Sequence, residues 1–327
     1  MNLSTLDRPP RLPLNTFGIA FGTAGLAASW TTASATLDAP SWIGEVLWFA
    51  AAAAWAVTII RYLRRPGGLG SVLTDLRHPV LGPFAALVPV VGALLSAHLA
   101  AVSPGVARVG VWAMTILITA FGAWFISALF TQPRDASAVH GGYLLPTVAG
   151  SLLAAQSLAA VGDTRIAVGY FAAGVLFWIL IGAAILARLM TGPELAGPLL
   201  PTLAILSAPP AVAGNAWWGI TGGAPSQVHG LLAGVMVALL LPQLFLIRRY
   251  VGSGFAIGFW AMTFTTAASA TYGLRLLRVD GASPWWSWLV LAVATLIVGT
   301  IAVSSVTLTA LRARQTHPTS TFAARTR

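Results

Sequence analysis

Ten apolar stretches long enough to cross a bilayer follow one another along this chain, and they constrain its fold more than any other feature. A membrane-spanning helix needs about 20 predominantly apolar residues. The stretches are 16–35, 43–63, 79–100, 106–130, 141–161, 166–189, 196–219, 227–249, 254–277 and 284–311. Only short connections rich in Pro, Gly, Asp and Arg separate them, which leaves no room for a second folded domain between spans. The sequence therefore predicts an all-α integral membrane protein with ten transmembrane helices.

The composition agrees with a protein immersed in lipid. Charged residues make up 8% of the chain and hydrophobic residues 57%, whereas about a quarter of the residues of a soluble domain are charged. A formal charge of +10 would suggest a nucleic-acid partner in a soluble protein. Here arginines in the loops on one side of the membrane explain it better, and we predict no binding of nucleic acid. The chain has no cysteine, which excludes disulfides, thiolate metal sites and cysteine nucleophiles.

The arginines indicate how the chain is oriented in the membrane. With ten spans both termini lie on one side, and fourteen of the 18 basic residues fall there: Arg8, Arg11, Arg61, Arg64, Arg65, Arg77, Arg134, Arg188, Arg248, Arg249, Arg312, Arg314, Arg325 and Arg327. The other four are Arg108, Arg165, Arg275 and Arg278. Because basic loops stay cytoplasmic, we predict a multi-pass protein of the cell membrane with both termini in the cytoplasm. A cytoplasmic segment (1–15) then precedes the membrane domain (16–311), and a cytoplasmic polar tail (312–327) follows it.

Helix-breaking residues concentrate in the odd-numbered spans. They include Pro83 and Pro89 in the third span, Pro146 in the fifth and Pro209 in the seventh. The first span has no proline but carries Gly18, Gly22 and Gly25. Broken backbone is tolerated at membrane depth only inside protein or along a water-filled cavity. This pattern favours five helical hairpins around an axis, with odd spans inside and even spans facing lipid. The alternative is that prolines are simply common in membrane helices.

The ninth span places one bulky ring beside a run of small side chains. Phe264 lies near its middle and is followed by Thr265, Thr266, Ala267, Ala268, Ser269, Ala270 and Thr271. Such a ring can plug a narrow path between helices. It can equally be a knob packed into a small-residue helix interface, which is the commoner use of small residues in membranes.

The ionisable residues exclude several functional classes. Every acidic residue lies in a loop or at the end of a span, which argues against a proton-coupled carrier with a buried carboxylate and against an acidic cation filter. The five histidines show no ligand-like spacing. No nucleotide loop or catalytic triad pattern stands at an interface; the glycines at 67, 68 and 70 are interpreted as a flexible linker. We therefore expect no enzyme, no catalytic residues, no cofactor and no metal.

Four segments together resemble the tellurite-resistance/dicarboxylate transporter family, which includes bacterial TehA and the slow-type anion channels of plant guard cells. They are FGIAFGTAGLAASW (17–30), HPVLGPFAALVP (78–89), YLLPTVAGSLLAAQSLAAVG (143–162) and GFAIGFWAMTFTTAASA (254–270). No single segment is a strict signature; their order, their spacing and the number of spans carry the resemblance over nearly the whole chain.

The resemblance implies a central pore lined by the odd helices, with Phe264 as its gate and with homotrimers that have one pore per subunit. The plant channels have proline directly after the gating ring, where this chain has Thr265, so the resemblance leaves a kink there open. The positions expected to line the pore or to kink its helices are Gly18, Gly22, Phe84, Pro89, Pro146, Pro209, Thr265 and Ser269.

The function expected from these features is an anion channel or a channel-like transporter in the lipid bilayer. Candidate anions are chloride, nitrate, malate, sulfite and tellurite. The alternative is a secondary carrier or exporter of a C4-dicarboxylate, of sulfite or of a tellurite-related oxyanion.

Overall fold

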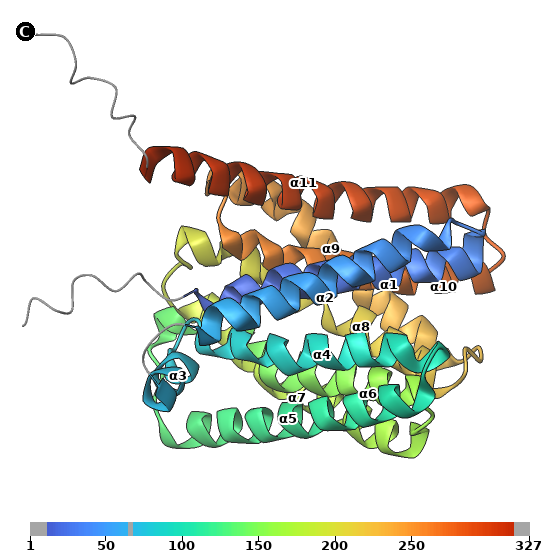
Figure 1. The fold of residues 1–327 in the computed structure, drawn as a ribbon, viewed down its shortest axis with the longest axis horizontal. Coiled ribbons are helices and arrows are strands. Elements are labelled where there is room, and N and C mark those ends of the chain that lie inside the picture. Colours follow the sequence, from blue (N-terminus) through green and yellow to red (C-terminus); the bar gives the residue numbers. More distant parts are fainter. Residues whose placement is uncertain (1–11, 65–67, 317–327) are drawn as a thin grey trace, which may run out of the picture.

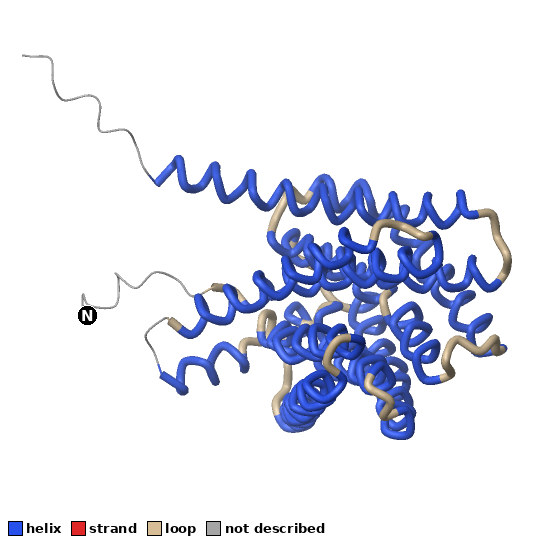
Figure 2. Tube along the Cα trace, turned by 45° about the vertical axis from the view of Figure 1, so that its right-hand side comes forward, coloured by secondary structure: helices blue, strands red, loops and turns tan. Residues whose placement is uncertain are grey.

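The computed structural model describes residues 12–64 and 68–316. Within these ranges every regular element is a helix, and the long helices run side by side along one common direction (Figures 1 and 2). The last helix continues to Thr316, past the predicted end of the membrane domain at 311. The segment 1–11 and the tail from 317 onward lie outside the described residues.

The even-numbered spans are uninterrupted α-helices. They are α2 (Ser41–Leu63), α5 (Pro104–Thr131), α7 (Thr164–Thr191), α9 (Gln227–Gly252) and α11 (Pro284–Thr316). Pro242 is the one proline inside α9 and does not divide it. Their α-helical backbone satisfies its own hydrogen bonds, as a helix that faces lipid must.

The odd-numbered spans all begin with an irregular turn before the α-helix starts. The first span runs from η2 (Leu14–Phe17) into α1 (Gly18–Leu37), and the third runs from η3 (Gly82–Ala86) through α4 (Leu87–His98) to η4 (Leu99–Ala101). The fifth span runs from η6 (Gly141–Leu144) through η7 (Leu145–Ala149) to α6 (Gly150–Ala160). The seventh span runs from η8 (Gly197–Ser207) into α8 (Pro209–Ile220), and the ninth runs from η9 (Ile257–Phe259) into α10 (Trp260–Val279). Most of these turns are 3₁₀-helical, and η7 is a π-helical turn that contains Pro146. Proline lacks the N–H that would continue the preceding turn, which accounts for the breaks in the third, fifth and seventh spans.

Burial separates the two sets of spans. Within the described residues, eight segments are long and apolar enough to cross a membrane. Among them, the odd ones have 56% to 78% of their most apolar window buried and the even ones 6% to 28%. The other two spans, α1 and α10, have 20 residues each and are rich in glycine, threonine and serine. These two small-residue helices also lie inside the bundle, so the predicted inner and outer sets of helices are confirmed.

The inner helices form a closed ring. Contacts join α1 to α4, α4 to α6, α6 to α8, α8 to α10 and α10 back to α1. Each inner helix also packs against the even helix that follows it, which makes five hairpins. In Figure 1, α11 lies at one edge of this bundle and α5 at the opposite edge.

The closest packing within the ring is between α1 and α10, where glycines of α1 meet side chains of α10. A Cβ atom at Gly18 would lie 3.1 Å from the Trp260 Cβ, and one at Gly22 would lie 2.7 Å from the Thr263 Cβ. Small residues allow two backbones to approach in this way, which is the usual mode of close helix packing in membranes.

The structure differs from the sequence interpretation in two local details. The connection between α2 and α4 contains a helix, α3 (Gly68–Arg77), where a flexible glycine linker was expected. Its apolar residues Leu69, Val72, Leu73 and Leu76 recur at the spacing of one helix face. In the third span the irregular turn precedes Pro89, which lies inside the first turn of α4. A proline there needs no partner for its missing N–H, so α4 begins in front of Pro89 without a kink at it.

Candidate pore and its constriction

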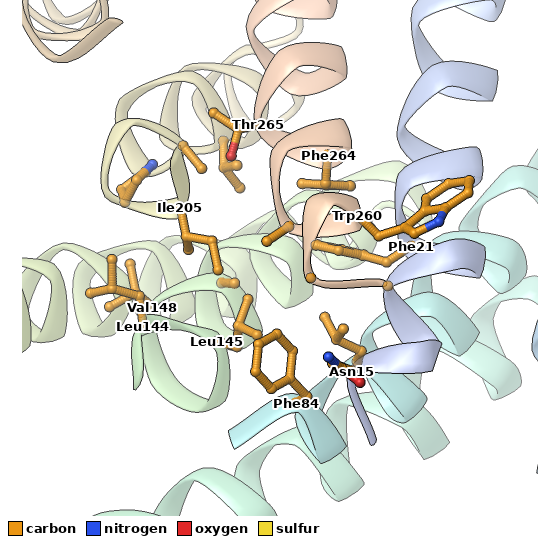
Figure 3. A pocket seen from close by; sticks show the side chains of 18 of the residues that line it. Asn15, Phe21, Phe84, Leu144, Leu145, Val148, Ile205, Trp260, Phe264 and Thr265 are labelled. Atoms are coloured by element: carbon orange, nitrogen blue, oxygen red, sulfur yellow. The ribbon is translucent and has the colours of Figure 1, made fainter. Parts of the chain in front are cut away.

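Two cavities lie in line along the axis of the inner ring. The first, here called the N-terminal cavity because it lies at the N-terminal ends of the inner helices, has a volume of about 40 Å³ and is shown in Figure 3. The second, the C-terminal cavity, has a volume of about 20 Å³. All residues that line the two cavities belong to the odd-numbered spans. Each cavity has room for about one or two water molecules.

Phe264 and Val212 are the only described residues that border both cavities. They come from α10 and α8, and their side chains are 7% and 2% exposed. The two residues therefore form the constriction that separates the cavities.

The Phe264 ring is held against helix α1. It stacks on Phe21 with the ring centroids 3.6 Å apart and an angle of 10° between the planes; the two rings lie together in Figure 3. A Cβ atom at Gly25 would lie 2.9 Å from the Phe264 Cδ2 atom. Glycine at position 25 thus makes room for the ring.

The N-terminal cavity is almost entirely apolar. Phe84 and Leu145 are among its lining side chains, and Asn15 and Thr265 are the polar ones (Figure 3). The Thr265 hydroxyl donates to the Ala204 carbonyl oxygen at 3.2 Å, which ties α10 to the irregular start of the seventh span. Helix α10 is α-helical through Thr265, and the irregular turn of the ninth span lies earlier, at η9.

The C-terminal cavity is more polar. Gln156, Asn215 and Thr271 line it together with small residues of α1 and α10. Among the described residues, no acidic side chain lines either cavity. The constriction thus separates a cavity with several amide and hydroxyl groups from one that is almost entirely apolar.

The structure brings five of the predicted site residues to the N-terminal cavity: Gly18, Phe84, Pro209, Phe264 and Thr265. Pro209 is the first residue of α8 and follows directly on the break in its span. The remaining four predicted residues, Gly22, Pro89, Pro146 and Ser269, border neither cavity.

Each of these four residues has another place in the fold. Gly22 faces the Thr263 side chain. Pro89 is buried in the first turn of α4. Pro146 borders a groove between α5 and α7 on the outside of the ring, so it marks a break in its span without facing the pore. The Ser269 hydroxyl is buried without a hydrogen-bond partner.

Sequence reasoning did not single out Phe21, Val212 or Asn215. Phe21 lies between Gly18 and Gly25 in the first of the family-like segments, and that position beside glycines was the available signal. Val212 and Asn215 are ordinary residues of a proline-rich span, and only the rotation of α8 shows that they face the axis.

Ionisable groups elsewhere in the described residues form no metal site, since no three His, Asp or Glu side chains converge. His98 contacts Glu45 at 3.0 Å.

His140 lies directly before the fifth span and is held by two hydrogen-bonding contacts. Its Nδ1 accepts from the Gly142 N–H at 3.1 Å, and its Nε2 lies 2.9 Å from the Val80 carbonyl oxygen. Burial lowers the pKa of His140 to about 4, so its ring is neutral at physiological pH.

The fold and the two aligned cavities define a multi-pass helical membrane protein with a central path through five inner helices. The chain matches the model of the SLAC1 family, described as "Voltage-dependent anion channel", over residues 11–308. It therefore belongs to this family, and the resemblance seen in its sequence is confirmed. Family membership makes it an anion channel or transporter of this type.

Three curated relatives illustrate the family. The chain is 28% identical over 267 residues to the "Tellurite resistance protein TehA homolog" of Haemophilus influenzae, covering 81% of each protein. It is 24% identical to the "S-type anion channel SLAH3" of Arabidopsis thaliana over 90% of this chain and 48% of that protein. It is 25% identical to the "S-type anion channel SLAH2" of the same plant over 80% of this chain and 52% of the relative. The aligned part thus spans about half the length of the plant relatives.

Proposed function

We propose that the chain is an anion channel of the cell membrane in which the Phe264 ring closes the pore between the inner helices. The observation that carries this proposal is that Phe264 borders both cavities. An ion moving from one cavity to the other has to pass this ring and Val212. An apolar constriction blocks hydrated ions because removing their water costs several kcal/mol or more.

The contacts of the ring support a gate that opens at low cost. The Phe264 ring stacks face to face on Phe21, an arrangement of two aromatic rings that is less favourable than offset or edge-to-face packing. Gly25 has no side chain that would lock the ring in place. A change of the Phe264 rotamer, or a small shift of α10 against α1, is then sufficient to join the two cavities.

The charges of the chain favour anions. In the part of the pore that the structure describes, no carboxylate faces either cavity. We place both termini, and with them the N-terminal cavity, on the cytoplasmic side, because most arginines of the chain lie at that end. A basic inner surface raises the local concentration of anions at the mouth of the pore. Chloride, nitrate and malate are the permeant anions that we consider first.

A second candidate function is a carrier of oxyanions such as sulfite or tellurite, or of a C4-dicarboxylate. The name of the Haemophilus influenzae relative mentions tellurite resistance, which fits the tellurite-related oxyanion, and a constriction between two cavities also suits alternating access. We further propose that the membrane domain 16–311 assembles as a homotrimer with one pore in each subunit; this part of the proposal rests on the family resemblance.

Currents through planar bilayers test the channel. Wild type, Phe264→Ala and the control Phe245→Ala would be compared under a potassium chloride gradient; Phe245 lies in α9 and is 87% exposed on the outside of the bundle. We expect Phe264→Ala to pass large currents that reverse near the chloride potential, with the control at the wild-type level. If no protein passes current while wild-type liposomes take up labelled malate or sulfite, the carrier is the better account.

A further inference from the structure

The face of α10 that lines the C-terminal cavity ends at a basic residue, Arg275. Phe264, Ala268 and Thr271 line the C-terminal cavity, and Arg275 follows Thr271 at the same spacing of three and four residues. Residues so spaced share one face of a helix. Arg275 thus stands one turn beyond the C-terminal cavity, on the face that lines it.

A residue of the cavity wall holds the guanidinium. The Arg275 Nη1 donates to the Asn215 Oδ1 at 3.1 Å and to the Asn215 backbone oxygen at 3.3 Å. Asn215 lines the C-terminal cavity and is 3% exposed. Its Nδ2 donates to the Ala268 carbonyl oxygen at 2.9 Å, which turns Oδ1 toward the arginine. The guanidinium carbon also lies 5.7 Å from the centre of the Trp218 ring.

No carboxylate neutralises this cation in the part of the chain that the structure describes. The ion pairs found there join His98 to Glu45 and Arg108 to Asp163. The Nε and Nη2 groups of Arg275 donate to no protein acceptor among the described residues, although the side chain is partly buried. Withdrawing a cation from water without a partner is costly, so a fixed arginine with free donors favours an anion beside it.

We propose that Arg275, positioned by Asn215, forms a binding site for small inorganic anions such as chloride and nitrate at the C-terminal mouth of the pore. The site rests on the proposed channel and extends it, because it assigns the preference for anions over cations to a residue outside the constriction. Its free N–H groups replace part of the water that an anion loses on entering, and its charge repels cations.

Reversal potentials test this site in the Phe264→Ala protein, where the constriction is open. Adding Arg275→Gln is expected to lower the chloride-to-potassium permeability ratio about fivefold or more, equivalent to roughly 1 kcal/mol of lost discrimination, and to raise the chloride concentration at half-maximal current. Arg275→Lys keeps the charge and is expected to retain most of the selectivity. The control is Arg278→Gln, which removes an exposed charge one turn further along α10 and is expected to change little.

A second variant removes the free charge without removing the arginine. Asn215→Asp places a carboxylate where Arg275 already donates, so the two residues form an ion pair, and selectivity is expected to fall as in Arg275→Gln. The proposed site would be overturned if folded Arg275→Gln or Asn215→Asp kept both the reversal potential and the chloride concentration at half-maximal current unchanged. If Phe264→Ala itself carries no anion current, the proposed channel fails instead, so the two failures are distinguishable.

Discussion

The Phe264 ring lies nearly parallel to the Phe21 ring, with 3.6 Å between the centroids and 10° between the planes. This contact joins α10 to α1 at the level of the constriction between the two cavities. Phe264 borders both cavities, while Phe21 borders only the N-terminal one. In the gate that we propose, Phe264 is therefore the obstacle and Phe21 supports its ring.

Replacing Phe21 by leucine removes this support but keeps most of the side-chain volume. Face-to-face stacking is the weaker arrangement of two rings, so its loss is expected to contribute at most about 1.5 kcal/mol and to raise the open-to-closed ratio by up to roughly tenfold. Single-channel recording of open probability measures the change. Phe125→Leu is the matched control, since Phe125 is a buried ring of α5 that borders neither cavity. An open probability in Phe21→Leu at or below that of the control would contradict the assigned support.

Val212 offers a way to close the pore again. In Phe264→Ala, the further change Val212→Phe places a ring at the same level of the pore from the neighbouring inner helix α8. We expect the macroscopic current of Phe264→Ala to drop on the order of tenfold or more, since each ~1.4 kcal/mol of added barrier is tenfold in rate. Val212→Ala in the same background is the control, and it should leave the current unchanged or larger. Equal currents in the phenylalanine and alanine variants would show that Val212 is not at the constriction.

The contact between α1 and α10 predicts a stability effect. In Gly22→Ala the new methyl group would overlap the Thr263 side chain, which is expected to cost about 1–3 kcal/mol through overpacking. The midpoint of thermal unfolding in detergent should fall accordingly. In the control Gly234→Ala, no atom lies within 4 Å of the new Cβ, so the midpoint should stay or rise slightly. A Gly22→Ala protein as stable as this control would contradict the close packing.

His140 predicts how stability depends on pH. Its pKa is about 4 in the folded protein against an ordinary 6.5, mainly because the ring is buried. Between these two values the unfolded chain binds a proton that the folded chain does not, so stability decreases as the pH falls from 6.5 to 4. The loss from this group approaches about 3 kcal/mol. Below pH 4 both states are protonated and the contribution levels off.

Thermal unfolding in detergent between pH 7.5 and 4.5 measures this effect. His140→Asn removes the titrating ring, so the midpoint of the variant should fall less steeply with decreasing pH than that of the wild type. Parallel curves for the two proteins would contradict the assignment to His140.

The inner and outer sets of helices were predictable because proline and glycine act locally. Pro146 and Pro209 lie at breaks of their spans, and burial follows from the rule that broken backbone must be shielded from lipid. Pro89 shows the limit of this reasoning. A proline within the first turn of a helix needs no partner for the missing N–H and causes no kink. Because the start of α4 at Leu87 could not be predicted from the sequence, neither could the position of Pro89 within its first turn.

The residues that contact Phe264 could not be predicted from the sequence because these contacts depend on how each helix is rotated about its axis. Phe21 is one of several aromatic residues in its span, and only the approach of α1 to α10 at Gly22 brings the two rings together. Gly22 and Ser269 have the small size expected at a pore, yet Gly22 faces the Thr263 side chain and the buried Ser269 hydroxyl borders neither cavity. Small residues serve helix contacts and pore walls equally well, so size alone does not distinguish the two.

A size series at position 264 tests the central claim most directly. Chloride currents in planar bilayers would be recorded for Ala, Val, Leu, Phe and Trp at this position, with protein amount and folding matched. The account predicts that current falls steadily as side-chain volume increases and that every measurable current reverses near the chloride potential. Currents that do not depend on the size of residue 264, in proteins that remain folded, would contradict the assignment of Phe264 as the gate.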